Sequence, residues 1–158
     1  MWRAVGISKS SGFTLIELLT VLVIIGLMSS AVVMTLPRDK PAVIAAATTL
    51  HTELNMAAQT SLLSGQVTAL SLSKDGYHFQ TASGDDWTAT AAKPWPSNIR
   101  IEFARAEQSI DLPQQALPLV LFDPTGGGTA FRLTLSDMDN DMVLTGSGDG
   151  TVSLVSGS

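Results

Sequence analysis

Glu17 is the residue that most clearly points to a chemical role, because it is the only ionisable side chain in a long apolar stretch. The stretch runs from Phe13 to Leu36 and comprises 24 residues. A charged side chain within a membrane-spanning helix costs roughly 2.5–3.5 kcal/mol on insertion scales. Because its insertion into a membrane costs this much free energy, the presence of Glu17 indicates a function.

A group of oxygen-bearing side chains at 137–141 raises the possibility of a calcium site. Asp137, Asp139, Asn140 and Asp141 carry the kind of ligand that hard cations bind. The run lacks the glycine and the distal glutamate of an EF-hand loop, and it falls where a turn between strands is expected. A solvated turn is therefore favoured, and no metal or cofactor is predicted.

The glycine clusters and the histidines do not indicate an active site. The run 126–128 lacks the Gly-Lys-Ser/Thr ending of a phosphate-binding loop, and the glycines of 146–150 precede no predicted helix. His51 and His78 have no second histidine at metal-ligand spacing, and no serine lies in a Gly-x-Ser-x-Gly elbow. The sequence predicts turns here and no enzyme.

Charge and cysteine content limit the possible partners. Between Pro41 and Ser158, five lysines and arginines stand against twelve aspartates and glutamates, a formal charge of −7. This charge repels phosphate backbones, so nucleic acid is not an expected partner. The chain has no cysteine, which excludes disulfides and cysteine-based metal or redox sites.

The apolar stretch at 13–36 is predicted to span a membrane. As a helix it would be about 36 Å long, against a hydrocarbon core of about 30 Å. Arg3 and Lys9 precede it without an acid, which predicts a cytoplasmic N-terminus and a globular domain on the other side. Three alternatives fit: a secretory signal peptide cut near Ser29 to Ala31, a plain anchor, and a prepilin leader followed by a pilin-type helix.

The residues around Glu17 favour the third alternative. They read Lys-Ser-Ser-Gly-Phe-Thr-Leu-Ile-Glu at 9–17, which resembles the type IV pilin and type II pseudopilin superfamily. The resemblance implies that a prepilin peptidase cleaves between Gly12 and Phe13 at the cytoplasmic face and that Phe13 is then N-methylated. The leader, 1–12, would be lost, and 13–36 would remain in the inner membrane lipid as a transmembrane and assembly helix.

The same resemblance implies a role in assembly for Glu17. Its carboxylate lies four residues, about one helical turn, after the new amino terminus. In the superfamily this carboxylate is thought to neutralise the amino terminus of a neighbouring subunit. Pairing on docking would remove the cost of an isolated charge in lipid and would favour the correct register.

The periodicity after Pro41 predicts an α+β domain. Apolar residues recur at three- and four-residue spacing from Val43 to Leu62, which indicates an amphipathic helix that ends at Gly65. Pro37 and Pro41 predict a bend before it. Strands are expected after it, in the order helix then antiparallel sheet, at 67–73, 77–81, 99–104, 119–122, 130–135, 142–145 and 151–155.

The segment 82–98 is predicted to be a long loop, because it is rich in alanine, threonine, serine, glycine and proline. It carries Trp87 and Trp95. Exposed aromatic residues on a long loop are frequent interface anchors, so the loop is a partner-contact hypothesis. The favoured interpretation is that both tryptophans fold back over the sheet.

A second motif narrows the assignment. Phe122, Pro124 and Gly126 lie in a Phe-x-Pro-x-Gly sequence, and the chain closes with a glycine-rich hairpin at 146–152. Together these features resemble the GspH and FimT family of pilin-like proteins. The resemblance implies a pilin-like fold, with a periplasmic globular domain at 37–158.

Resemblance to GspH implies a minor pseudopilin, a structural subunit near the tip of the type II secretion pseudopilus. Its implied partners are the major and minor pseudopilins, the prepilin peptidase and the inner-membrane assembly platform. Two other functions are weighed: a FimT-like minor pilin for pilus assembly or DNA uptake, and a periplasmic enzyme or carrier on a signal anchor. The acidic domain disfavours DNA uptake.

Overall fold

The chain consists of two compact units, which we describe separately. A computed structural model describes the backbone of residues 14–34 and 41–157, and side chains at 14–27 and 41–157. The units comprise residues 1–39 and 40–158. The predicted cleavage site at Gly12 and Phe13 and the predicted bend at Pro37 lie outside the described residues.

The first unit contains helix α1, Leu15–Met34. The Thr14 hydroxyl oxygen accepts a bond from the backbone N–H of Glu17 at 3.4 Å, as an N-cap residue does. Within the residues the structure describes, no helix is both long and apolar enough to cross a membrane. The predicted span, 13–36, extends past these residues at both ends and stays a prediction.

The second unit is built on helix α2, Ala42–Ser64. The helix follows Pro41 and ends at Gly65, whose backbone is left-handed with φ 68° and whose N–H donates to the Ser61 carbonyl. The predicted amphipathic helix and its glycine C-cap are confirmed. Its inner face consists of small and aliphatic residues, all buried: Val43, Ala47, Leu50, Leu54, Ala57 and Ser61.

Two antiparallel sheets follow the helix, each with five strands. In the first sheet the strand order is β3-β2-β1-β7, and β4 also pairs with β2. Its strands are β1 (Thr68–Leu72), β2 (Gly76–Ser83), β3 (Asp86–Ala89), β4 (Lys93–Pro94) and β7 (Leu117–Phe122). The predicted hairpin at 67–81 is the β1–β2 pair.

In the second sheet the strand order is β10-β9-β8-β5-β6. Its strands are β5 (Arg100–Arg105), β6 (Gln108–Ile110), β8 (Phe131–Ser136), β9 (Asp141–Gly146) and β10 (Val152–Ser156). All five predicted strands after residue 98 are present. The short strand β6 was not predicted.

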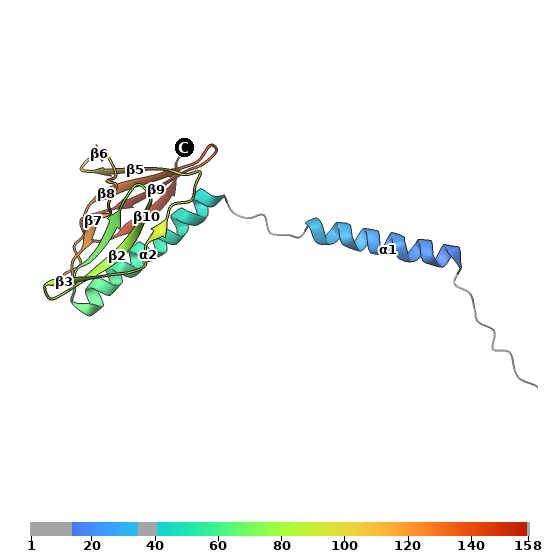
Figure 1. Ribbon diagram of the computed structural model, residues 1–158, viewed down its shortest axis with the longest axis horizontal. Helices are drawn as coiled ribbons and strands as arrows, with labels where there is room; N and C mark the ends of the chain where they lie inside the picture. The colour runs from blue at the N-terminus through green and yellow to red at the C-terminus, as the bar shows by residue number, and fades with distance from the viewer. Residues whose placement is uncertain (1–13, 35–40, 158) are drawn as a thin grey trace, which may run out of the picture. The chain divides into compact units, whose positions relative to one another are not determined.

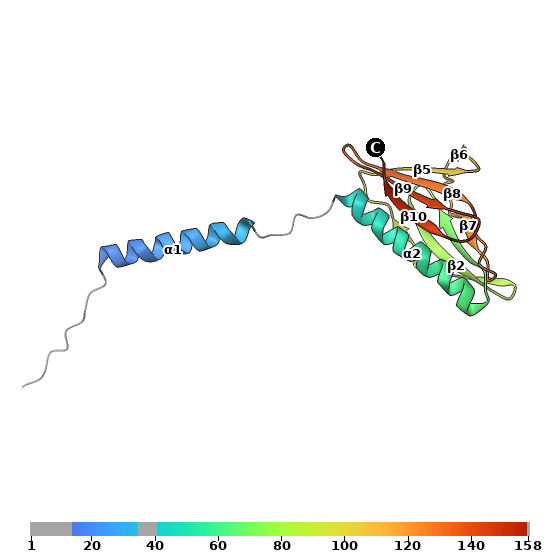
Figure 2. The same ribbon diagram turned by 180° about the vertical axis from the view of Figure 1, so that it is seen from behind.

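The core lies where α2 meets both sheets. Figures 1 and 2 show α2 running along the strands, with β9 and β10 beside it. Its apolar face packs against inward side chains from both sheets, among them Leu70, Val120, Phe122, Leu133 and Leu144. Because residues 40–158 form a compact unit with their own core, we expect this domain to fold by itself.

The prediction of a long loop at 82–98 is wrong in part. β3 and β4 lie inside this segment and both pair with β2, Gln80 opposite Ala89 and Tyr77 opposite Lys93. The composition of the segment is typical of loops, but the open side of β2 offers it a partner. Pairing with β2 outweighs local preference here.

Candidate functional site

The Phe-x-Pro-x-Gly motif forms a tight turn at the end of β7. The carboxylate of Asp123 accepts hydrogen bonds from the backbone N–H groups of Thr125, at 2.7 Å, and Gly127, at 3.3 Å. It also accepts a bond from the Thr125 hydroxyl. These bonds, that of the Thr125 hydroxyl first, lower the pKa of Asp123. The carboxylate therefore holds the turn together.

The glycines after this turn pack against the β9–β10 turn. The N–H of Gly128 donates to the carbonyl of Gly148 at 3.0 Å. A Cβ atom on Gly128 would lie 2.9 Å from the Cα of Gly150, and one on Gly150 would lie 2.8 Å from the carbonyl oxygen of Gly126. The two turns approach too closely for side chains, which explains the glycines at these positions.

The β9–β10 turn is held by Asp149. Its carboxylate accepts bonds from the Ser147 hydroxyl at 2.8 Å, the Thr151 hydroxyl at 2.7 Å and the Thr151 N–H at 3.1 Å. The hydroxyl of Thr151, then that of Ser147, are the main causes that lower the pKa of Asp149 to about 2. Asp149 therefore has the same role in its turn that Asp123 has in the other.

The end of helix α2 contacts the first of these two turns. The buried hydroxyl of Ser61 lies 2.7 Å from the Gln66 carbonyl and 2.9 Å from the Phe122 carbonyl. Phe122 is buried, and the Leu62 side chain lies where a Cβ atom on Gly126 would point. The two family motifs of the domain thus meet at one end of α2, and we call this place, residues 122–128 and 146–151, the double turn.

The double turn has the chemistry of a structural site. In both Asp123 and Asp149, one carboxylate oxygen accepts hydrogen bonds from donors of its own turn. In the described part of the chain, no group of three or more histidines, cysteines and acids could hold a metal ion. The arrangement stabilises the end of the domain.

Glu17 lies in the first turn of α1, where its side chain is exposed. It follows Thr14 by three residues, and Ser/Thr-x-x-Glu is the capping-box pattern. An acid in the first turn also interacts favourably with the positive end of the helix dipole. This local contribution was not predicted, although the spacing is visible in the sequence.

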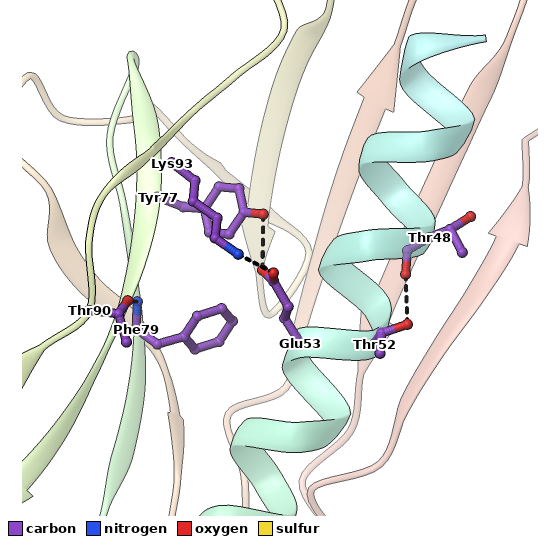
Figure 3. Close-up of polar contacts among 7 residues, drawn as sticks. All are labelled: Thr48, Thr52, Glu53, Tyr77, Phe79, Thr90 and Lys93. Atoms are coloured by element: carbon purple, nitrogen blue, oxygen red, sulfur yellow. Dashed lines mark hydrogen bonds and ion pairs between the residues drawn. The ribbon is translucent and has the colours of Figure 1, made fainter. Parts of the chain in front are cut away.

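A polar contact between α2 and the first sheet was also missed. Figure 3 shows Tyr77 and Lys93 converging on Glu53. The Tyr77 hydroxyl donates to Glu53 at 3.0 Å, and Lys93 forms an ion pair with the same carboxylate. Burial, then the bond to Glu53, raises the pKa of Tyr77. The contact ties β4 to α2.

The two tryptophans of the segment 82–98 differ. Trp95 packs on the ring of Tyr77, with centroids 4.8 Å apart, and its indole N–H donates to the Ser73 carbonyl at 3.0 Å. It is half-buried against the core, as expected. Trp87 lies in β3 and is 47% exposed, so the expectation that it covers the sheet is not met.

The acidic group at 137–141 forms the turn between β8 and β9. The carboxylate of Asp137 accepts bonds from the backbone N–H groups of Asp139, at 2.8 Å, and Asn140, at 2.7 Å. These bonds, that of Asp139 first, lower the pKa of Asp137. The predicted turn is present, and Asp137 stabilises it from within.

One protein family and one sequence motif match the chain. The family described as type II transport protein GspH matches residues 46–153, and the prokaryotic N-terminal methylation motif matches residues 7–33. No curated protein matches the sequence.

Solved structures show the same fold. The minor pseudopilin EpsH from the type 2 secretion system of Vibrio cholerae is 16% identical, with a TM-score of 0.62 over 73% of this chain and 98% of that one. GspH of E. coli is 17% identical, with a TM-score of 0.57 over 77% of this chain and 94% of that one. The predicted α+β, pilin-like fold is confirmed.

The matches to the family and to the methylation motif imply a subunit anchored in the bacterial inner membrane that associates with other pseudopilins. The GspH match covers well over half of the chain and includes the double turn and the face of α2 that packs on it. The chain belongs to the GspH family of type II transport proteins.

Proposed function

We propose that the chain is a structural subunit near the tip of a type II secretion pseudopilus and that it supports the export of folded proteins across the outer membrane. The strongest support is that the N-terminal methylation motif and the GspH domain occur in one chain. The methylation motif covers residues 7–33 and the GspH match covers residues 46–153. Neither the motif nor the domain alone would identify this role.

In this proposal the chain is made as a precursor. A prepilin peptidase removes residues 1–12 by cutting between Gly12 and Phe13, and Phe13 is N-methylated. The match to the methylation motif supports this processing. A Gly12→Val variant should keep its leader and remain heavier than the wild-type chain on a gel, whereas a Ser11→Ala variant should be processed normally.

The orientation follows from charge. Arg3 and Lys9 place the leader in the cytoplasm, and the acidic globular domain then faces the periplasm. There it contacts other pseudopilins, while the inner-membrane platform drives assembly. We propose no catalytic activity for the chain.

Glu17 completes the proposal. Its exposed carboxylate in the first turn of α1 is free to meet the amino terminus of a neighbouring subunit. We expect Glu17→Ala to prevent incorporation into the pseudopilus, because an amine would then be left without its counter-charge. Glu17→Asp should retain part of the function. If Glu17→Ala were incorporated at the wild-type level, this role would be refuted.

Deletion of the gene tests the function. Loss of exoprotein export with normal twitching and DNA uptake, restored by the wild-type chain, is the expected result. Loss of twitching or DNA uptake with normal export would instead identify a FimT-like minor pilin. Tight DNA binding by residues 41–158 in a gel-shift assay at low salt would point the same way, against the charge of −7.

A further inference from the structure

Strand β10 forms one edge of the second sheet and pairs only with β9. The Ser147 N–H donates to the Thr151 carbonyl, and the Gly157 N–H donates to the Asp141 carbonyl. In an antiparallel pair, alternate residues bond to the neighbouring strand. Residues 151, 153, 155 and 157 therefore face β9, and the backbone groups of Val152, Leu154 and Ser156 point away from it.

These outward groups are open along most of the strand. The Val152 carbonyl lies 3.1 Å from the Nε2 atom of His51 on α2, which closes one end of the edge. The N–H and carbonyl groups of Leu154 and Ser156 have no partner among the described residues. Ser153, Val155 and Ser156 are exposed. An unpaired edge of this kind is a template for another strand.

The other sheet edges are protected. On β7, Pro118 interrupts the strand, Arg105 donates to the Leu119 carbonyl, and Thr129 bonds to both the N–H and the carbonyl of Leu121. The strand β3 is short and begins at an acid, β4 consists of Lys93 and Pro94, and β6 has three residues. Short edges, charges, proline and covering side chains all prevent edge pairing.

Beyond Val152, β10 has none of these protections. Its sequence, Val-Ser-Leu-Val-Ser, contains no charge and no proline, and its register with β9 is regular. Val155 is 59% exposed on the outer face. A free edge of this composition favours aggregation unless another polypeptide covers it.

We propose that β10 accepts an extended, uncharged segment of a neighbouring pseudopilin, which adds to the second sheet as a further strand. The main-chain groups of Leu154 and Ser156 bind the segment, and Val155 contacts an apolar side chain on it. His51 limits the added strand to the Ser156 end of β10. The inference rests on the proposed function, because the neighbour is a subunit of the same pseudopilus.

The net charge of the domain favours a different subunit over a second copy. Two copies of the globular domain each carry a formal charge of −7 and repel one another. Two β10 strands paired about Leu154 would also place Ser156 of one copy opposite Val152 of the other, whose carbonyl His51 already occupies.

Hydrogen exchange tests the proposal on residues 41–158, which belong to a compact unit with its own core. In the free domain, the amides of Leu154 and Ser156 should exchange fast, whereas those of Ser153 and Val155 should be protected by β9. Globular domains of the other pseudopilins from the same organism are then added one at a time. One of them should protect Leu154 and Ser156 by at least about tenfold.

Two variants block the edge without disturbing β9. Ser156→Pro removes only an outward N–H, and Val155→Lys places a charge at an exposed position. Each should weaken binding of that pseudopilin roughly tenfold or more. The matched controls, Ser156→Ala and Val155→Thr, should bind like the wild type.

Three results of the binding experiments would overturn the proposal: a partner that binds without protecting Leu154 and Ser156, wild-type binding by both blocked variants, or protection that rises with the concentration of this domain alone. The full chain with both blocking substitutions should also fail to restore export in the deletion strain. If it restored export like the wild type, the edge proposal would fail and the proposed function would stand. If the wild-type chain failed as well, the proposed function itself would be wrong.

Discussion

Individual glycines in the double turn are constrained by backbone contact. Gly128→Ala places a Cβ atom 2.9 Å from the Cα of Gly150, so the two turns must separate. We expect a loss of about 1–3 kcal/mol in the free energy of unfolding, measured by urea denaturation of residues 41–158.

Gly148 is the matched control, because nothing lies within 4 Å of a Cβ atom there. Gly148→Ala should change the free energy of unfolding by less than about 0.5 kcal/mol. Equal losses in the two variants would contradict the close approach of the turns.

Asp149 makes stability depend on acid pH. Its pKa is lowered from 3.8 to about 2 in the folded domain. A carboxyl group of this kind contributes stability that is present above its unfolded pKa and is lost as the pH falls through its folded pKa. The melting temperature of the wild-type domain should therefore decrease as the pH is lowered from about 4 to about 2.

Asp149→Asn keeps an oxygen acceptor but cannot ionise. Its melting temperature should fall less steeply over the same pH range than that of the wild type. Part of the dependence should remain, because hydrogen bonds also lower the pKa values of Asp123 and Asp137. Parallel curves for the two proteins would show that the bonds to Asp149 do not favour its charged form.

The roles of these carboxylates could be predicted from the sequence only in part. Asp-Pro-Thr-Gly and Ser-Gly-Asp-Gly sequences indicate turns locally. The contact between the turns joins Gly128 and Gly150, which are distant in sequence, so no local pattern reveals it. The partners of Glu53 could not be predicted either. Helical spacing places Glu53 near the polar side of α2, but it does not reveal the contacts with Tyr77 and Lys93.

At the scale of elements, β4 and the residue after it anchor the first sheet on the core. Trp95 packs on Tyr77 and donates to Ser73, so Trp95→Ala should lower the free energy of unfolding by about 3 kcal/mol. Trp87 is 47% exposed on β3, and Trp87→Ala should cost less than about 1 kcal/mol.

Urea denaturation followed by far-ultraviolet circular dichroism measures both tryptophan variants without relying on tryptophan fluorescence. A larger loss for Trp87→Ala than for Trp95→Ala would contradict the packing described for the two residues.

Elements with a strong period were predictable, whereas those that depend on a partner strand were not. The regular spacing from Val43 to Leu62 and the glycine at 65 defined α2 and its end. β3 and β4 have the composition of a loop and become strands only because β2 is available. β6 pairs with β5 but has only three residues, and a pattern of three residues is too short to detect.

At the scale of the whole molecule, the chain joins an apolar helix to an acidic domain. The helix carries one acid, Glu17, in its first turn, and the domain carries a formal charge of −7. The family identifies the domain, but the proposed mode of assembly depends on how the N-terminus is processed. The central claim therefore concerns Phe13.

Mass spectrometry of the chain purified from its native membranes tests this claim most directly. We expect a mature protein that begins at Phe13, carries one methyl group on its new amino terminus and retains the whole of α1. A chain that begins after Ala31, as a conventional signal peptidase would leave it, would contradict the account.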